Sequence, residues 1–235
     1  MHIIPVIDIK DGQAVAAIKG QRAFYTPLET PLSASPEPQK VIQGLLDFYP
    51  FDTVYCADLN AITRQGNNRA LLHELLECYP KVTFWIDEGL TANTAIEVFE
   101  PNYRAIIGSE CQNDSIGKPL ENRSDAWILS LDFFPDSGYR GPKQLLQNPN
   151  LWPENVIIMS LAYVGLNQGP DFEKLNYFCQ RYPQHKFVCA GGIRNTLDLQ
   201  YLIKMGVKQA LVASAIHNGQ LTPDNLRELA KKCPD

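Results

Sequence analysis

Eight short apolar segments recur along the 235-residue chain, and most are followed by a polar loop and a stretch with helical spacing. That alternation is typical of repeated βα units, in which helices cover a parallel sheet. Strands are expected near residues 3–9, 52–58, 82–87, 103–108, 126–132, 155–161, 186–190 and 208–213. Eight units in a chain close to the typical ~250 residues predict one α/β domain over residues 1–235, a (β/α)8 TIM barrel.

The intervening segments predict the outer helices, near residues 38–49, 67–79, 91–100, 142–149, 171–182, 195–205 and 223–232. Thr91 and Asn195 stand where helix N-caps belong, and Pro170-Asp171 suits the opening of the helix that follows. Residues 111–123 contain Gly117 and Pro119. A helix after the fourth strand is therefore expected to be short or broken.

The connection after the first strand, about residues 10–38, is unusually long and contains four prolines. A loop of more than about 15 residues is often a lid or a binding loop. A small hairpin packed over the barrel mouth explains the same segment equally well, and the sequence leaves both interpretations open.

Composition narrows the range of partners. The net charge is −5 and no run of Lys or Arg occurs, which argues against nucleic-acid binding because a phosphate backbone requires a concentrated positive surface. The apolar run at residues 2–7 is too short for a signal or membrane segment. We therefore expect a cytoplasmic protein with no nucleic-acid or membrane partner; the sequence does not determine its oligomeric state.

The cysteines and histidines show no metal-ligand spacing, so neither a metal site nor a cofactor is expected. Mg²⁺ held transiently by Asp87 and Glu88 is an alternative to plain solvated acids there. The six cysteines are expected to be reduced thiols. The cysteines are Cys56, Cys78, Cys111, Cys179, Cys189 and Cys233, and the histidines are His2, His73, His185 and His217.

The chain contains an internal repeat. Residues 84–91 are similar to residues 187–194, and residues 104–109 are similar to residues 209–214 at nearly the same offset. Extending this register places Asp8 opposite Asp132. The repeat predicts two similar half-barrels, although all buried βα units share a strand-glycine-helix pattern and some chance similarity is expected.

Carboxylates end several of the predicted strands. Active sites of (β/α)8 barrels lie at the C-terminal strand ends, and two carboxylates facing one substrate are able to divide the acid and base roles. The symmetrical placement makes Asp8 and Asp132 the candidate catalytic pair. Asp58, Asp87 and Glu88 form a candidate acidic corner, suited to a cationic, amino or hydroxyl-bearing group; a strand-end Asp also serves equally well as a cap for the next loop.

A phosphate site is predicted near Gly191 and Gly192, together with Ala213 and Ser214. Glycines let backbone amides approach an anion, and a helix N-terminus after the eighth strand adds partial positive charge. In the first half, Glu88 stands in place of Gly191 and Asp87 precedes it, which leaves Gly108-Ser109 as its remaining phosphate-binding feature. The sequence thus predicts one phosphate site and a small phosphorylated metabolite as the partner.

These segments resemble the HisA/HisF family of histidine biosynthesis over nearly the whole chain. The resemblance lies in residues 4–12, 57–61, 129–132, 165–171 and 190–193. It implies a duplicated half-barrel with a phosphate site in each half, an Amadori rearrangement of a phosphoribosyl substrate, and catalytic roles for Asp8 and Asp132. Gly169, in the fourth segment, joins the phosphate-binding candidates by this resemblance.

Two motifs depart from the family pattern. Asp87-Glu88-Gly89 stands where the family has a glycine turn, and Met159-Ser160 replaces the Thr-Asp after strand six. Residues 19–22, 25–28, 57–62, 107–110 and 211–219 are similar to a HisA-related branch that accompanies tetrahydromethanopterin-linked one-carbon metabolism. An acid-base isomerase diverged toward methanopterin- or methanofuran-linked biosynthesis is the leading hypothesis; a genuine HisA isomerase, HisF-like lyase chemistry and a non-catalytic ligand-binding barrel are the alternatives.

Overall fold

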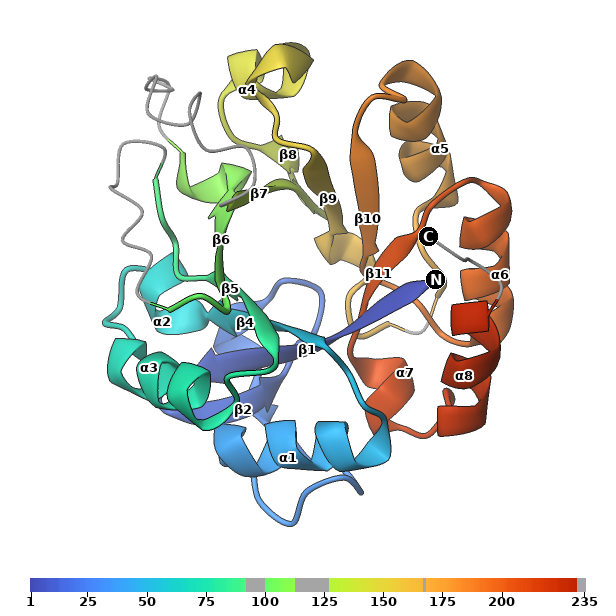
Figure 1. The fold of residues 1–235 in the computed structure, drawn as a ribbon. Coiled ribbons are helices and arrows are strands. Elements are labelled where there is room, and N and C mark those ends of the chain that lie inside the picture. Colours follow the sequence, from blue (N-terminus) through green and yellow to red (C-terminus); the bar gives the residue numbers. More distant parts are fainter. Residues whose placement is uncertain (92–99, 113–126, 167, 232–235) are drawn as a thin grey trace.

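The eight predicted strands form a closed parallel barrel in the computed structural model (Figure 1). The structure describes residues 1–91, 100–112, 127–166 and 168–231. Each strand pairs in parallel with the next, and β11 pairs with β1 to close the sheet. The barrel strands are β1 His2–Lys10, β4 Thr53–Asp58, β5 Thr83–Asp87, β6 Tyr103–Gly108, β7 Trp127–Phe134, β9 Asn155–Ser160, β10 Lys186–Ala190 and β11 Gln209–Val212.

Strand alternation sorts the buried side chains into two cores, because successive side chains point to opposite faces of a strand. One core fills the barrel and takes residues from every strand: Ile4, Tyr55, Trp85, Ile106, Ile128, Ile157, Val188 and Leu211. The other lies between the barrel and the helices and includes Ile7, Cys56 and Ile86. The parity of a residue within its strand therefore decides which core it joins.

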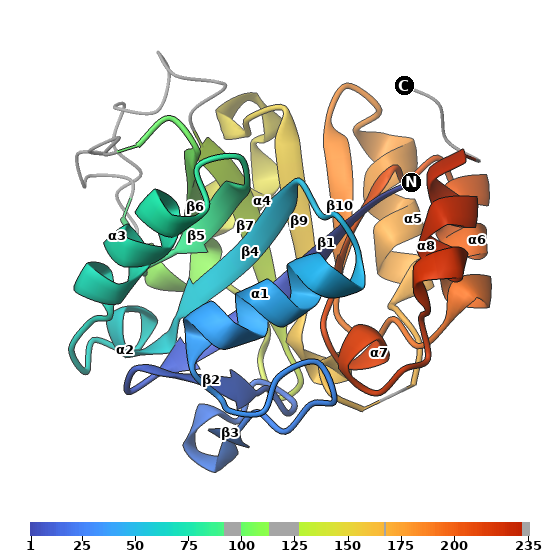
Figure 2. The ribbon, with the colours of Figure 1, turned by 60° about the horizontal axis from the view of Figure 1, so that its bottom comes forward.

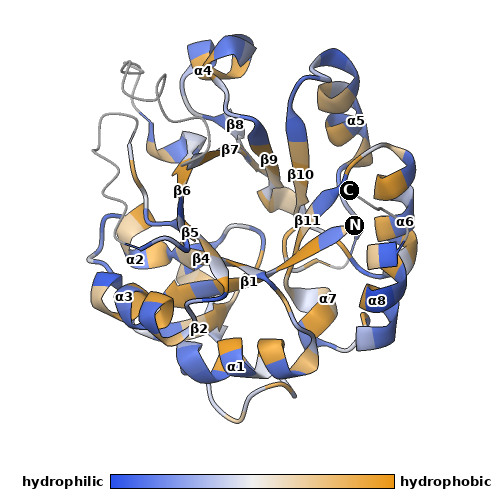
Figure 3. Cartoon of the chain, in the orientation of Figure 1, coloured by the Kyte–Doolittle hydropathy of each residue, from blue (hydrophilic) through white to orange (hydrophobic). Residues whose placement is uncertain are grey.

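Helices surround the barrel with their apolar sides against it (Figure 3). These are α1 Pro38–Phe48, α3 Arg69–Cys78, α4 Lys143–Gln147, α5 Phe172–Arg181, α6 Thr196–Lys204 and α8 Pro223–Lys231. Asn195 and Asp171 cap α6 and α5 through side-chain oxygens, as predicted. The helix expected at 91–100 and the segment 111–123 lie almost entirely outside the described residues.

The long connection after β1 takes the hairpin form. β2, Gln13–Ala16, runs antiparallel to β1 and pairs with β3, Thr26–Pro27. A matching extension occurs in the second half, where β8, Gly138–Arg140, runs antiparallel to β7. The predicted half-barrels thus correspond in this detail as well. Figure 2 shows the β2–β3 hairpin and the short helix α7, Ser214–His217, at the end of the barrel opposite the N-terminus.

Two further findings concern the chemistry of the chain. The five described cysteines are free thiols, and Cys233 lies outside the described residues. Among the helices in the described ranges, none combines the length and apolar character needed to cross a membrane.

The packing of α1 against the loop after β3 yields a test of the fold. Gly44 lies in α1, and a Cβ built there would be 1.9 Å from the Leu32 carbonyl oxygen. Ala favours an exposed helix over Gly by about 1 kcal/mol, but this contact requires backbone movement. We expect Gly44→Ala to lower the free energy of unfolding by about 2 kcal/mol or more, measured by urea denaturation. Gln43→Ala, at the exposed neighbouring position, should change it by less than about 0.5 kcal/mol; equal effects would contradict the packing.

Candidate functional site

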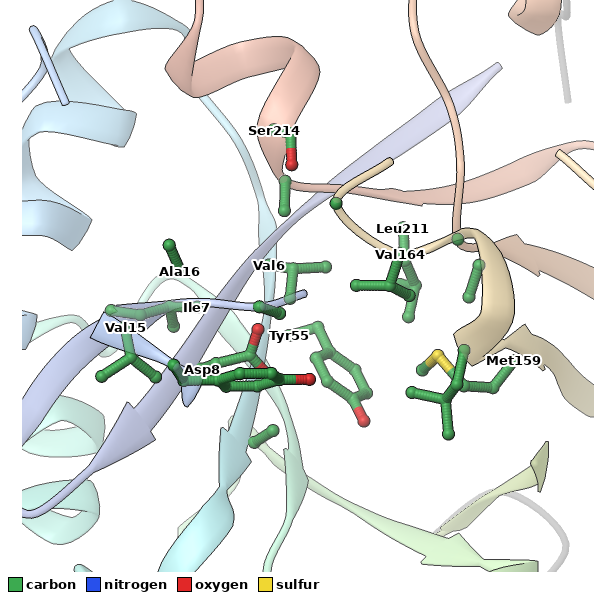
Figure 4. A pocket seen from close by; sticks show the side chains of 18 of the residues that line it. Val6, Ile7, Asp8, Val15, Ala16, Tyr55, Met159, Val164, Leu211 and Ser214 are labelled. Carbon is green, nitrogen blue, oxygen red and sulfur yellow. The ribbon is translucent and has the colours of Figure 1, made fainter. Parts of the chain in front are cut away.

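A cavity of about 310 Å³ opens at the C-terminal ends of the strands. Its wall combines strand ends with the β2–β3 hairpin and the turn after β6. Figure 4 shows Asp8 and Tyr55 on one part of the wall and Ser214 at the start of α7 on another. The predicted site residues on this wall are Asp8, Asp87, Asp132, Gly191, Gly192, Ala213 and Ser214.

Asp8 extends from the last part of β1 into the cavity, on the same side of the strand as Ile4. Burial raises the pKa of its carboxyl group to about 6, and the charge of Arg22 opposes that rise. A carboxyl group with a pKa near 6 is mostly ionised at pH 7 but still exchanges protons readily. Asp8 is therefore suited to accepting a proton.

Asp132 is buried on β7 and held by hydrogen bonds to its carboxyl group and its backbone. Ser130 Oγ donates to its Oδ1 at 2.6 Å, and the Glu110 backbone N–H donates to Oδ2 at 3.1 Å. The Ser109 hydroxyl lies 3.3 Å from Oδ2 and accepts from the Asp132 backbone N–H at 2.9 Å. Burial and the charge of Glu110 raise the pKa of Asp132 to about 7, despite these hydrogen bonds. The carboxyl group is fixed in position and readily protonated.

Asp87 enters the same cavity from the end of β5. Its Oδ1 accepts from the Gly89 backbone N–H at 3.1 Å, and its Oδ2 lies 3.4 Å from the Tyr55 hydroxyl. Burial and the neighbouring charge of Asp132 raise the pKa of Asp87 to about 7. The first-half strand end is thus acidic within the cavity, where the second half has Ala190.

Asp58 and Glu88 lie elsewhere, so the three residues of the predicted acidic corner do not gather at one place. Asp58 caps the short helix α2, Leu59–Ile62, and accepts from the Asn68 backbone N–H at 2.6 Å. Glu88 accepts from the Tyr103 hydroxyl at 2.7 Å. Both residues immediately follow an inward-facing position, so alternation turns their side chains to the outside of the barrel.

The ion pair of Arg22 and Glu110 was not singled out from the sequence. Arg22 lies in the loop after β2 and Glu110 in the 3-10 turn Ser109–Cys111 after β6. The guanidinium binds both carboxylate oxygens of Glu110, one of them at 2.9 Å, and both side chains line the cavity. This pair joins the long first loop to the opposite side of the mouth. The position of Glu110 just after a strand end was a signal in the sequence, whereas Arg22 lies within the long loop, where no local pattern marks it.

The glycines of the second half allow close backbone approach. Gly191 has φ +100°, and a Cβ there would be 2.4 Å from the Ser160 carbonyl oxygen; Gly192 has φ +84°. Gly169 does not line the cavity: its carbonyl oxygen lies directly behind Gly192, where it would be 2.3 Å from a Cβ built on that residue. Gly108 and Ser109 also lie behind the wall, against Asp132.

The wall between the glycines and the carboxylates includes apolar side chains and a neutral histidine. Met159, Val164 and Leu211 form part of it (Figure 4). His217 Nδ1 lies 3.1 Å from Thr30 Oγ1, and burial lowers the pKa of the imidazole to about 4. The site thus has one acidic side and one neutral, glycine-lined side. Within the described ranges, no three His, Cys, Asp or Glu side chains are grouped to hold a metal ion.

The family model for "Histidine biosynthesis protein" matches residues 2–137 and 145–222. The chain belongs to the histidine biosynthesis protein family. An uncharacterized protein of Methanocaldococcus jannaschii is 30% identical over the full length of both chains. A phosphoribosyl imidazole-4-carboxamide isomerase of Paenarthrobacter aurescens is 25% identical over 94% of this chain and 92% of its own. Phosphoribosyl isomerase A of Streptomyces avermitilis is 23% identical over 99% and 98% of the two chains. The predicted family is thereby confirmed.

In this member of the histidine biosynthesis protein family, the partly buried Asp8 makes stability depend on pH. Its pKa in the folded protein is about 6, against an ordinary value of 3.8. Between about pH 4 and pH 6 the Asp8 carboxyl group is mostly ionised in the unfolded chain but mostly protonated in the folded protein. The folded state therefore loses stability as the pH rises through this range. Asp8→Asn removes this loss. We expect the free energy of unfolding of the variant to exceed that of the wild type by about 1–2 kcal/mol at pH 8, a figure that allows for screening by water in the cavity. At pH 4 the two free energies should be almost equal.

Urea denaturation at the two pH values measures this difference. Asp47→Asn, on the exposed side of α1, provides a control that should show no such pH-dependent gain. An equal effect of Asp8→Asn at pH 4 and pH 8 would show that burial does not raise the pKa of Asp8.

Proposed function

We propose that this protein is an isomerase of a small phosphorylated metabolite, in which Asp8 and Asp132 carry out acid-base catalysis. The observation that carries the proposal is that both carboxyl groups line the same cavity as Gly191, Gly192 and Ser214. The isomerase names of two relatives in the family support the reaction class.

The proposed reaction moves a proton along the substrate. One carboxylate removes a proton from a carbon beside a carbonyl or imine, and the other carboxyl group delivers a proton to the neighbouring centre. The pKa of Asp8 is about 6 and that of Asp132 about 7. The charge of Arg22 favours the ionised form of Asp8, and the charge of Glu110 favours the protonated form of Asp132, so we assign Asp8 as the base and Asp132 as the acid.

The phosphate group is proposed to lie at the second-half glycines. Backbone amides at Gly191 and Gly192 are accessible because neither residue has a side chain, and Ser214 adds a hydroxyl at the start of α7. On the other side of the cavity, Asp87 and Asp132 repel an anion. The ligand is therefore oriented with its phosphate toward α7 and its reacting part toward the carboxylates.

A genuine histidine-biosynthesis isomerase is the second candidate, since the named isomerase relatives match nearly the full chain. The acidic Asp87 disfavours it, because a substrate with two phosphates would place one beside a carboxylate. A diverged role in methanopterin- or methanofuran-linked biosynthesis agrees better with this change, because it does not require a second phosphate beside Asp87.

Turnover tests the catalytic assignment. Incubation with a metabolite extract from the source cells should convert one phosphorylated compound into a product of equal mass but different retention time in chromatography, as isomerisation requires. Asp8→Asn and Asp132→Asn should each lower this rate by about 100-fold or more while the circular dichroism spectrum stays unchanged. Full activity in either variant would contradict the assignment, and Asp47→Asn is the control for removal of a surface carboxylate.

Complementation separates the two candidate isomerases. We expect no growth without histidine when the wild-type gene is placed in a strain that lacks the histidine isomerase. Growth that Asp8→Asn abolishes would establish the histidine-biosynthesis reaction instead.

An anion-bound crystal structure tests the phosphate end. In crystals grown with sulfate, we expect one anion at Gly191, Gly192 and Ser214 and none beside Asp87. An anion at Asp87, or none at the glycines, would contradict the proposed orientation. Anion binding without any turnover would favour the non-catalytic ligand-binding barrel.

A further inference from the structure

Asp87 and Asp132 reach into the cavity from β5 and β7, on either side of β6. Gly108 ends the strand between them, and a Cβ built there would be 3.3 Å from Asp132 Oδ2 and 3.5 Å from Asp87 Oδ2. The two oxygens therefore lie beside the same point, in a space that glycine leaves open. Any side chain at position 108 would fill the gap between the carboxyl groups.

The hydrogen bonds of both carboxyl groups come from neutral donors. Asp87 is held by the Gly89 backbone N–H and faces the Tyr55 hydroxyl. Asp132 accepts from the Ser130 hydroxyl and the Glu110 backbone N–H, and the Ser109 hydroxyl, which donates to the Arg140 carbonyl oxygen at 2.6 Å, lies 3.3 Å from its Oδ2. Both side chains are almost completely buried, with relative exposures of 6% for Asp87 and 4% for Asp132. No formal positive charge is bonded to either member of the pair among the described contacts.

The surrounding charges do not neutralise the pair. Arg22 is the cation that faces the cavity, and Glu110 binds it through both carboxylate oxygens. Arg140, on β8, turns its guanidinium to Asp136 and the Phe134 ring. Among the described residues, the other titratable groups near the pair are acidic or neutral: Asp8 of β1, Tyr55 of β4, Tyr103 of β6, Cys111 of the following turn and Tyr139 of β8.

We propose that Asp87 is a third catalytic carboxyl group and that it shares a single proton with Asp132. Two carboxylates in one buried space repel each other, so the second proton is removed only at a much higher pH than the first. Burial and the charge of Asp132 raise the pKa of Asp87, in agreement with this arrangement, and burial with the charge of Glu110 raises the pKa of Asp132.

The consequence for catalysis rests on the proposed function. The pair, in place of Asp132 alone, is the proton donor, and Asp8 is the acceptor. One proton passes from the substrate carbon to Asp8 and one passes from the pair to the substrate, so the substrate keeps its composition. The repulsion that remains between two ionised carboxylates then favours the return of a proton to the pair, from Asp8 through water.

A titration without substrate tests the shared proton. Protein labelled with ¹³C at the aspartate carboxyl carbons is followed by NMR from pH 4 to pH 9, and the resonances are assigned from the single variants. We expect Asp87→Asn to lower the midpoint of Asp132 by about one pH unit or more, a tenfold change in proton affinity. The wild-type pair should titrate in two steps, and each Asn variant should lack the upper step and keep a single titration of the remaining carboxyl group.

Glu88→Gln is the matched control. It removes a carboxylate next to Asp87 in the chain that lies outside the cavity, bonded to Tyr103, and it should leave the midpoint of Asp132 unchanged. An upper titration step that persists in both Asn variants, or its absence from the wild type, would overturn the shared proton. If one Asn variant fails to fold, Gly108→Ala serves in its place, because a methyl group between the carboxyl groups should alter both midpoints together. The titration needs no turnover, so its failure is distinct from failure of the isomerase proposal.

Discussion

The hydrogen bonding of β11 to β1 is the constraint on which the rest of the structure depends. Once Ile3 and Ala210 pair in parallel, the sheet has no free edge among the eight barrel strands. Every strand then has one face inside the barrel and one face toward the helices. Closure also brings all C-terminal strand ends to one mouth, so residues far apart in sequence, such as Asp8 and Asp132, line one cavity.

Closure explains how much of the site was predictable. The inward faces of the strands repeat every second residue, so Asp8 shares a face with Ile4, and Asp87 shares a face with Trp85. The same parity places Asp58 and Glu88 outside, where they cap α2 and bond Tyr103. From their strand-end positions alone, Asp58, Asp87 and Glu88 were predicted to form one acidic corner. Counting every second residue along each strand from the inward-facing core would have placed Asp87 inside the barrel and the other two outside.

Other parts of the site depend on contacts that no local pattern encodes. Arg22 and Glu110 are 88 positions apart and meet because the β2–β3 hairpin folds over the mouth. A proline-rich connection is compatible with a hairpin or an open loop, and its pairing partner is set by the barrel beneath it. Likewise, Ser109 appeared to be a phosphate ligand, yet its hydroxyl contacts Asp132 and the Arg140 carbonyl oxygen. Ser109 is buried behind the wall of the cavity, where it positions the Asp132 side chain and does not face a ligand.

The ion pair also determines the charge that a ligand encounters. If Arg22 were free, its guanidinium would attract the phosphate toward the carboxylates and compete with the glycines on the far wall. Because Glu110 binds both ends of the guanidinium, the acidic side keeps a net negative charge at neutral pH. Two like charges about 4 Å apart repel by about 1 kcal/mol in water and about 4 kcal/mol near a protein surface. For the proposed monophosphate ligand, this repulsion favours one orientation, with the phosphate away from the carboxylates, and the ion pair that fastens the hairpin to the mouth maintains it.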